Sequence, residues 1–284
     1  MNLRNPESIG HVLPVIVIRP SRGWIALHLR EVWQYRELLL ILSWRNIAVK
    51  YKQALLGVSW AVLQPLATML IFTIIFGRFA KLPSDGIPYP IFALAALLPW
   101  QLFAGALTSS GASLVSNANL LTKVYFPRLI IPLAAVLSGV IEFGISFVLL
   151  VGLLVWYHIP LTWTMLALPL FMLYALLTAL AVGIWVSALN VEYRDVQHML
   201  PFVVQIWLYA SPVAYSASLV PSGPWRILYG LNPMAGVIQG FRWSLFGGAP
   251  PRDLFYVSLA IVVVLLITGL INFKRMERVF ADIV

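Results

Sequence analysis

Long runs without a charged residue alternate with short polar stretches along this chain of 284 residues. The runs cover residues 53–77, 86–122, 143–191, 196–225 and 254–273. Each is at least as long as the roughly 20 helical residues that cross ~30 Å of hydrocarbon. The run 143–191 is interrupted at Tyr157-His158-Ile159-Pro160, which predicts a hairpin between two spans. The pattern predicts an all-α integral membrane protein.

Six transmembrane helices account for these runs. We expect the first at about 53–77, the second at about 91–113, the third and fourth on either side of the 157–160 hairpin, the fifth at about 200–219 and the sixth at 254–273. Ser211-Pro212 is expected to kink the fifth span, because proline removes a backbone hydrogen bond. The 15 uncharged residues between Arg226 and Arg242 are too few to cross, which predicts a re-entrant hairpin on the external side before the last span.

The chain divides into residues 1–52, a cytoplasmic N-terminal segment, and residues 53–284, the six-span transmembrane domain. From Ile25 to Ile47 apolar residues recur at spacings of three and four, which predicts an amphipathic helix lying in the membrane interface. A buried helix of a small soluble domain is the alternative, and the nearby first span disfavours it. No cleaved signal peptide is expected, because Pro14 breaks the short apolar stretch near the N-terminus.

Charge indicates which end faces the cytoplasm. Of the 19 Lys and Arg residues, 14 lie in the N-terminal segment, the 117–128 and 190–198 loops and the C-terminal tail, and five lie in the opposite loops. The positive-inside rule therefore places both termini in the cytoplasm. The net charge of +9 fits contact with anionic lipid headgroups, because the basic residues form no stripe typical of nucleic-acid binding.

Hydrophobic residues make up 61% of the chain and charged residues 10%, against about a quarter in soluble domains. The chain has no cysteine and no nucleotide-binding glycine-rich loop of the form GxxxxGK[ST]. Its four histidines are isolated, and no paired carboxylates face a common cleft. These features argue against an enzyme, a metal site or a cofactor held by this chain.

Glu142 is the acidic residue that lies far inside a predicted span. It follows Arg128 by 14 positions, which is roughly 21 Å of helix and near or beyond mid-membrane. A charge there costs on the order of 3 kcal/mol, so Glu142 should face a polar cavity, a subunit partner or be protonated. A gating or conduction role and a structural glutamate hydrogen-bonded between helices stay equally open, because one acid without a basic partner shows no relay.

Aromatic residues inside the spans suggest a lining on which sugar rings stack. The candidate path residues, with Glu142 among them, are Trp60, Phe72, Phe76, Trp100, Phe103, Glu142, Phe143 and Phe147. The small residues Gly105, Ser109 and Ser113, spaced at four, would shape one wall of that path. Interfacial anchoring and helix packing explain the same residues singly, so only the group is proposed.

Four stretches, in order, resemble the permease subunits of ATP-binding-cassette polysaccharide and polyol-phosphate exporters. They are Trp44–Pro65 (WRNIAVKYKQALLGVSWAVLQP), Leu97–Arg128 (LLPWQLFAGALTSSGASLVSNANLLTKVYFPR), Ser187–Tyr215 (SALNVEYRDVQHMLPFVVQIWLYASPVAY) and Leu231–Arg242 (LNPMAGVIQGFR). The resemblance covers nearly the whole chain from about Val12 and is strongest to the O-antigen export permeases.

The resemblance implies a homodimeric permease in the cytoplasmic (inner) membrane that moves a lipid-linked polysaccharide. It also implies two copies of a separate ATPase subunit, which bind the ATP and Mg. In the family the interfacial helix and the first cytoplasmic loop contact this ATPase, which maps onto about Ile25–Lys52 and Asn117–Arg128. The candidate coupling residues of the two cytoplasmic loops are Asn117, Asn119, Lys123, Tyr125, Arg128, Glu192, Arg194 and Asp195.

Other functions remain open on the sequence. A teichoic-acid or capsule exporter permease is the nearest alternative. An ATPase-independent secondary transporter or channel is disfavoured because no internal repeat is evident and Glu142 stands alone. A membrane-embedded glycosyltransferase is disfavoured because Glu192 and Asp195 are too few acidic groups for its site.

Overall fold

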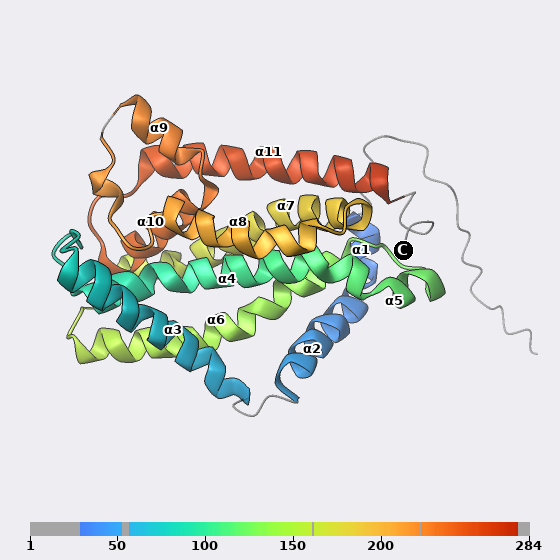
Figure 1. Cartoon of the computed structure of the whole chain (residues 1–284), viewed down its shortest axis with the longest axis horizontal. Coiled ribbons are helices and arrows are strands. Elements are labelled where there is room, and N and C mark those ends of the chain that lie inside the picture. Colours follow the sequence, from blue (N-terminus) through green and yellow to red (C-terminus); the bar gives the residue numbers. More distant parts are fainter. Residues whose placement is uncertain (1–28, 53–56, 161, 222, 278–284) are drawn as a thin grey trace, which may run out of the picture.

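The computed structural model describes residues 29–52, 57–160, 162–221 and 223–277, and every regular element within them is helical. In chain order the helices are α1 (Leu29–Gln34), α2 (Arg36–Lys52), α3 (Trp60–Phe72, continued by a π-helix Thr73–Phe79), α4 (Tyr89–Ser116), α5 (Ala118–Lys123), α6 (Ile130–Trp156), α7 (Leu168–Glu192), α8 (Val196–Ala210), α9 (Pro224–Gly230), α10 (Pro233–Phe246) and α11 (Arg252–Met276). Figure 1 shows them as one elongated bundle. The all-α prediction is confirmed for these residues.

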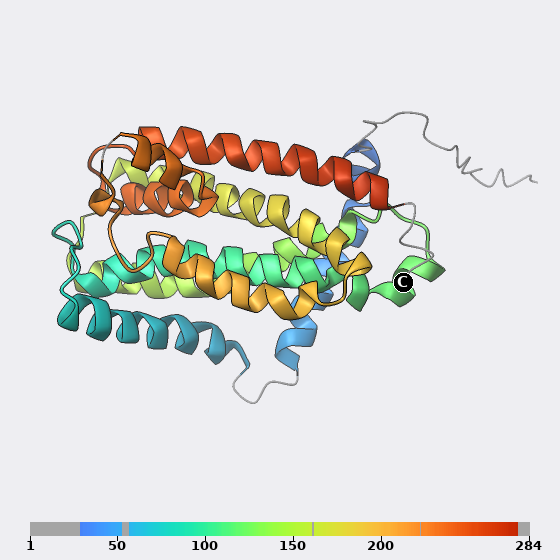
Figure 2. The same cartoon turned by 45° about the horizontal axis from the view of Figure 1, so that its top comes forward.

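Five segments are long and apolar enough to cross a membrane. They are Trp60–Phe79, Tyr89–Ser116, Ile130–Trp156, Trp163–Glu192 and Leu254–Met276. α4 is the most buried of them and packs against α6 and α7, while α3 and α11 lie on opposite edges of the bundle in Figures 1 and 2. The chain is therefore built as an integral membrane protein around a central helix.

Small residues set the distance between α4 and α7. A Cβ on Gly183 would lie 2.6 Å from the Ser110 Oγ, and a Cβ on Gly111 would lie 2.8 Å from the Val186 side chain. Across the same contact, the Asn190 Nδ2 donates to the Gly111 carbonyl at 3.0 Å. Close approach maximises dispersion contacts, which hold helices together where lipid removes the hydrophobic driving force.

The predicted fifth span differs from the helix that forms. α8 ends at Ala210 after 15 residues instead of continuing through a kink to 219. Ser211 is extended, with ψ at 152°, because a residue that precedes proline is disfavoured in the helical region. At 15 residues, α8 is shorter than the five segments above.

Two short helices follow where the hairpin is predicted. α9 and α10 are joined at Leu231 and Asn232, and the Asn232 Oδ1 accepts a hydrogen bond from the Met234 backbone N–H at 3.1 Å. This is an N-cap on α10, which also begins with the favourable Pro233. α10 is almost entirely buried between α4, α7 and α11. The chain thus forms a helical pair at the end of the bundle opposite α5 (Figure 1).

The connections sort to two ends of the bundle. α1, α5, the 193–195 turn and the C-terminal end of α11 lie at one end, while the α3–α4 and α6–α7 connections and the α9–α10 pair lie at the other (Figures 1 and 2). In the described part of the chain, the segments that carry most of the basic residues therefore lie at the same end of the bundle, as the charge count predicts.

The buried apolar residues form two clusters. The larger one surrounds α4, and the smaller one joins Leu42 of α2, Leu121 of α5 and Phe126 to the nearby ends of α4, α6, α7 and α11. The opposite side of α1 and α2 exposes Trp33, Leu40, Ile41 and Trp44. The predicted interfacial helix spans 25–47, of which 25–28 lie outside the described residues, and the observed helices break near Tyr35 and continue to Lys52.

Candidate functional site

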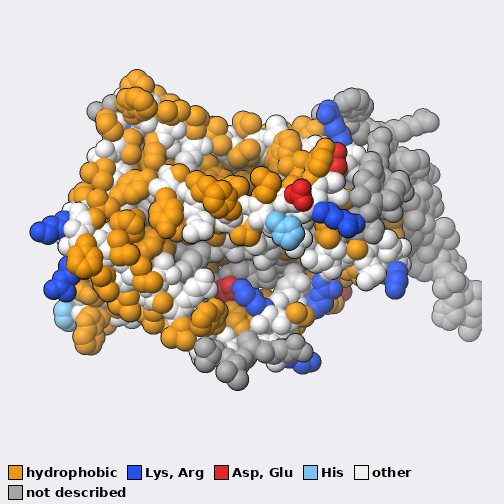
Figure 3. Space-filling view, in the orientation of Figure 1, with side chains coloured by type: hydrophobic (Ala, Val, Ile, Leu, Met, Phe, Trp, Pro, Cys, Tyr) orange, Lys and Arg blue, Asp and Glu red, His pale blue; other side chains and the backbone are white. Residues whose placement is uncertain are grey.

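A cavity of about 870 Å³ opens between α2, α3, α4 and α6, and Leu208 of α8 also borders it. We call it the α2–α4 groove. Figure 3 views the molecule in the orientation of Figure 1, and acidic and basic side chains interrupt the apolar surface in its lower half. The lining residues with polar or charged side chains are Arg45, Asn46, Lys50, Gln64, Thr68, Gln101, Ser109, Ser113, Ser116, Asn117, Ser138, Glu142 and Ser146.

The small-residue stripe on α4 forms one wall of the groove. Gly105, Ser109 and Ser113 all line it. A Cβ on Gly105 would meet no atom within 4 Å, so this position faces open space instead of a neighbouring helix. The spacing of four places these residues on one face, and their small size leaves the volume unfilled.

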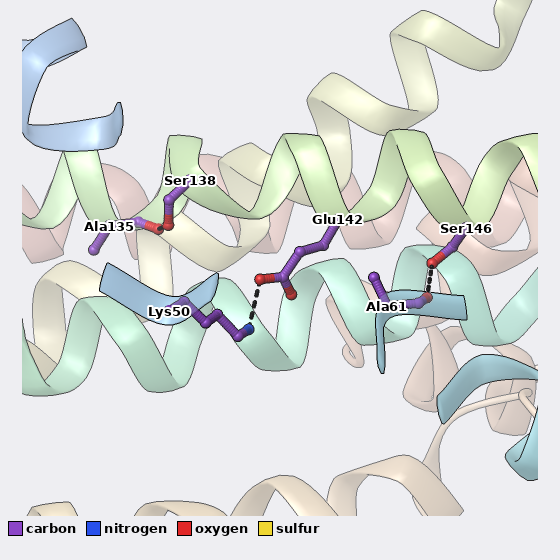
Figure 4. A network of polar contacts seen from close by, with 6 residues as sticks. All are labelled: Lys50, Ala61, Ala135, Ser138, Glu142 and Ser146. Atoms are coloured by element: carbon purple, nitrogen blue, oxygen red, sulfur yellow. Dashed lines mark hydrogen bonds and ion pairs between the residues drawn. The ribbon is translucent and has the colours of Figure 1, made fainter. Parts of the chain in front are cut away.

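Glu142 lies in this groove with a basic partner. Its Oε1 is 2.5 Å from the Lys50 Nζ at the end of α2 (Figure 4). Burial, and then the Glu142 carboxylate, raise the pKa of Tyr51 to about 12, so the neighbouring phenol stays protonated at neutral pH. The expectation that Glu142 lacks a basic partner was wrong. The partner comes from α2, which crosses α6 at this point.

Glu142 lies near the middle of α6, which is one of the five candidate spans. One turn further along α6, the Ser146 Oγ donates to the carbonyl of Ala61 in the first turn of α3, at 3.0 Å (Figure 4). Glu142 therefore lies at the level where α3 begins.

A second polar contact joins α2 to the end of α4. The Arg45 Nη2 donates to the Asn117 Oδ1 at 2.5 Å, and the Asn117 Nδ2 donates to the Ser113 carbonyl at 2.7 Å. Arg45 and Lys50 therefore attach α2 across the groove at two places. Of the candidate coupling residues, Asn117 is the one that borders the groove.

The other coupling candidates of the first loop lie within α5 or just after it. Asn119, Lys123 and Tyr125 are exposed, whereas the neighbouring Phe126 is buried and anchors the loop. The Arg128 guanidinium donates to the Glu277 backbone carbonyl, which ties the loop to the end of α11.

The candidates of the second loop lie in the turn between α7 and α8. Glu192, Arg194 and Asp195 are all exposed, and the Glu192 carboxylate raises the pKa of Tyr193. Within the described part of the chain, Arg194 forms no ion pair with Glu192 or Asp195. Ion pairs among these three described residues therefore do not hold this turn.

The candidate aromatic residues separate into three groups. Trp100 and Phe143 line the groove beside Glu142. Phe72 and Phe76 pack edge to face at 5.2 Å, Phe147 stacks on Phe143 at 5.8 Å, and Phe103 is fully buried with its ring 5.1 Å from Trp207. Trp60 lies exposed at the start of α3. Three of the eight candidate path residues therefore meet in one cavity.

Sequence reasoning missed Arg242, which it treated only as the end of an uncharged run. This side chain on α10 is buried, and its five N–H groups donate to four backbone carbonyls at 2.7–3.3 Å. The acceptors are Phe92 in α4 and Pro212, Val213 and Tyr215 in the turn after α8. An arginine in an otherwise apolar hairpin was the signal available, because such a charge must be fully hydrogen-bonded.

Comparison with known proteins identifies the family. Residues 37–246, from α2 through α10, match the sequence profile of the ABC-2 type transporters. The chain belongs to the ABC-2 type transporter family. It is 30% identical to the O-antigen export system permease protein RfbA of Myxococcus xanthus, over 89% of this chain and 97% of that protein.

Further relatives of this ABC-2 chain carry related names. RfbA of Klebsiella pneumoniae is 29% identical over 87% of this chain and 95% of that protein. The polysialic acid transport protein KpsM of Escherichia coli is 25% identical over 82% of this chain and 91% of that protein. Within the described residues of this family member, no group of three or more His, Cys, Asp or Glu residues is arranged to hold a metal ion.

Proposed function

We propose that this chain is the membrane-spanning permease of an ATP-driven exporter that moves a lipid-linked polysaccharide, of the O-antigen type, out across the cytoplasmic membrane. The observation that carries the proposal is the near full-length similarity to permeases named for O-antigen export. The groove supports it, because an open cavity lined by hydroxyls, amides and two ring faces suits a polyol better than an inorganic ion.

The working assembly in this proposal is a dimer of the permease with two ATPase subunits. α3 exposes a row of large apolar side chains that suits either lipid or a second copy: Leu63, Leu70, Ile71, Ile74 and Ile75. α8 together with the turn that follows it supplies the sixth crossing, because the 15 residues of α8 alone are too few to cross, and the α9–α10 pair is the re-entrant hairpin on the external side. Both termini then face the cytoplasm, where most basic residues lie.

Coupling to the ATPase is assigned to α2 and the α5 loop. Exposed Lys123 and Tyr125 present a polar surface at the end of the bundle, and buried Phe126 holds that surface to α6. Arg45 and Lys50 connect α2 to the walls of the groove. A push on α2 or α5 would therefore reach the groove directly through bonded side chains.

Passage of a long glycan requires weak and repeated contacts, because tight binding at one register would trap the chain. Trp100 and Phe143 supply ring faces, and the Gly105–Ser113 stripe supplies space and hydroxyls. Glu142 is the acidic side chain of this lining and is already paired with Lys50. The proposed path runs along this groove toward the external end.

Deletion of the gene and complementation test the proposal. We expect the deletion to remove polysaccharide from the cell surface while lipid-linked glycan accumulates inside, and the wild-type chain to restore export. An ATPase subunit should co-purify with the tagged permease, whereas the chain purified alone should bind no ATP. Loss of a capsule instead of O-antigen would favour the function named for KpsM, and unchanged surface glycans would refute both.

A further inference from the structure

Five residues of α2 line the groove: Arg45, Asn46, Ile47, Val49 and Lys50. The pairs Arg45 and Val49, and Asn46 and Lys50, are four positions apart, which places them on one face of the helix. Two of the five are cationic, and the acidic side chain that lines the groove opposite them is Glu142. The α2 end of the groove therefore has an excess of positive charge.

The cations on this face of α2 are only partly engaged. The hydrogen bonds that the structure describes for Arg45 all use its Nη2, and the Lys50 ammonium meets one oxygen of Glu142. The Lys50 side chain is 59% exposed and that of Glu142 33%, so water or a ligand can reach both. A pair this accessible is worth under about 1 kcal/mol, so it does not hold the fold together.

The wall beside these cations is amphipathic. α3 presents Gln64 and Thr68 to the groove and exposes Leu63, Leu70 and Ile71 elsewhere on its surface. A ligand with a polar anionic head and an apolar tail would match both surfaces of this one helix. A purely soluble anion would use the groove alone.

We propose that the α2 end of the groove binds the phosphate-bearing headgroup of an amphiphile through Arg45 and Lys50, and that Glu142 occupies the Lys50 ammonium while no headgroup is there. The inference rests on the proposed export of a lipid-linked glycan, and it assigns the place where the lipid phosphate docks. Arg45 offers a planar fork for phosphate oxygens, and Lys50 a mobile point charge.

Glu142 then acts as a competing anion. When the phosphate pairs with the Lys50 ammonium, the Glu142 carboxylate loses this partner. It still accepts a hydrogen bond from the nearby Tyr51 hydroxyl and is partly exposed to water. Competition lowers the affinity of the headgroup, which favours its release once the glycan moves on. Neutralising Glu142 should therefore tighten binding, and this result is the opposite of what a simple structural ion pair would give.

The test uses the full-length permease in phosphatidylcholine nanodiscs, titrated with dodecyl phosphate by isothermal calorimetry, with empty nanodiscs as the blank. Lys50→Ala should weaken binding by about tenfold, as expected for loss of one charge-assisted contact. Lys50→Arg should retain most of the affinity. Glu142→Gln should strengthen binding several-fold, while Lys52→Ala, two residues along and exposed, should have no effect. Thermal unfolding of each variant checks that the fold is intact.

Two further titrations separate the sources of the phosphate. Dodecanol should show no dependence on Lys50, and inorganic phosphate should bind far more weakly than dodecyl phosphate. Equal binding of inorganic phosphate would overturn the amphiphile and identify a soluble anion. Equal affinities of the wild type, Lys50→Ala and Glu142→Gln would overturn the site. Failure here, with export still lost on gene deletion, would leave the proposed function intact.

Discussion

Replacing Arg242 with methionine should destabilise the permease more than any surface substitution. The guanidinium makes five hydrogen bonds to the carbonyls of Phe92, Pro212, Val213 and Tyr215, and it lies 3.5 Å from the Phe92 ring centroid. Methionine fills similar space and leaves those four acceptors without their donor. Each buried carbonyl left without a donor costs about 1 kcal/mol or more of stability. The variant no longer has to bury the charge of the arginine, which offsets part of this cost. The net loss in the free energy of unfolding is about 3–5 kcal/mol.

The assay is the apparent melting temperature of the purified protein in detergent. At roughly 2–4 °C per kcal/mol, the loss corresponds to about 6–20 °C. Arg242→Lys keeps the charge but lacks the planar fork, so it should fall between methionine and wild type. Arg252→Met is the matched control, because Arg252 is exposed in the first turn of α11, where a cation gains nothing from the helix dipole. A methionine variant that melts within about 2 °C of wild type would refute the reasoning.

Three other expectations follow from the packing and the charge distribution. Gly240→Ala should sharply lower permease abundance, because its Cβ would lie 1.9 Å from a ring carbon of Phe171, whereas Gly105→Ala, with nothing within 4 Å, should be tolerated. Trp100 and Phe103 are both buried, so alanine at either position should cost about 3–5 kcal/mol of stability and lower permease abundance, but only Trp100→Ala, which removes a ring that lines the groove, should also reduce surface polysaccharide per permease molecule. Because the chain has no cysteine, Lys123→Cys reports topology cleanly, and labelling by an impermeant reagent from the periplasm in intact cells would contradict a cytoplasmic α5 loop.

The long helices follow from hydropathy alone because lipid requires each crossing to bury about 20 apolar residues and satisfy its own backbone. Where the helices end was harder to predict. Pro212 marks the break after α8, but choosing between a kink and a stop depends on the N–H donors that Arg242 of α10 supplies to the carbonyls of this turn. That contact joins residues far apart in the chain, so no local pattern contains it.

The groove was predictable in part. The spacing of Gly105, Ser109 and Ser113 identified one wall, and Glu142 was singled out by its charge. Its partner Lys50 was missed, because the position of α2 against α6 is a tertiary contact. Trp100 and Phe103 could not be told apart, since α4 is buried on nearly every side and hydropathy then distinguishes no face.

The division of the apolar core has a mechanical consequence. The small cluster of Leu42, Leu121 and Phe126 is separate from the large one around α4. Breaking a few contacts in it releases α2 and α5 at a fraction of the free energy that unfolds the bundle. A displacement of α2 and α5 against the larger core should therefore cost less free energy than opening that core. Such a displacement would change the width of the groove, since Arg45 joins α2 to Asn117 at the end of α4 and Lys50 joins it to Glu142 of α6.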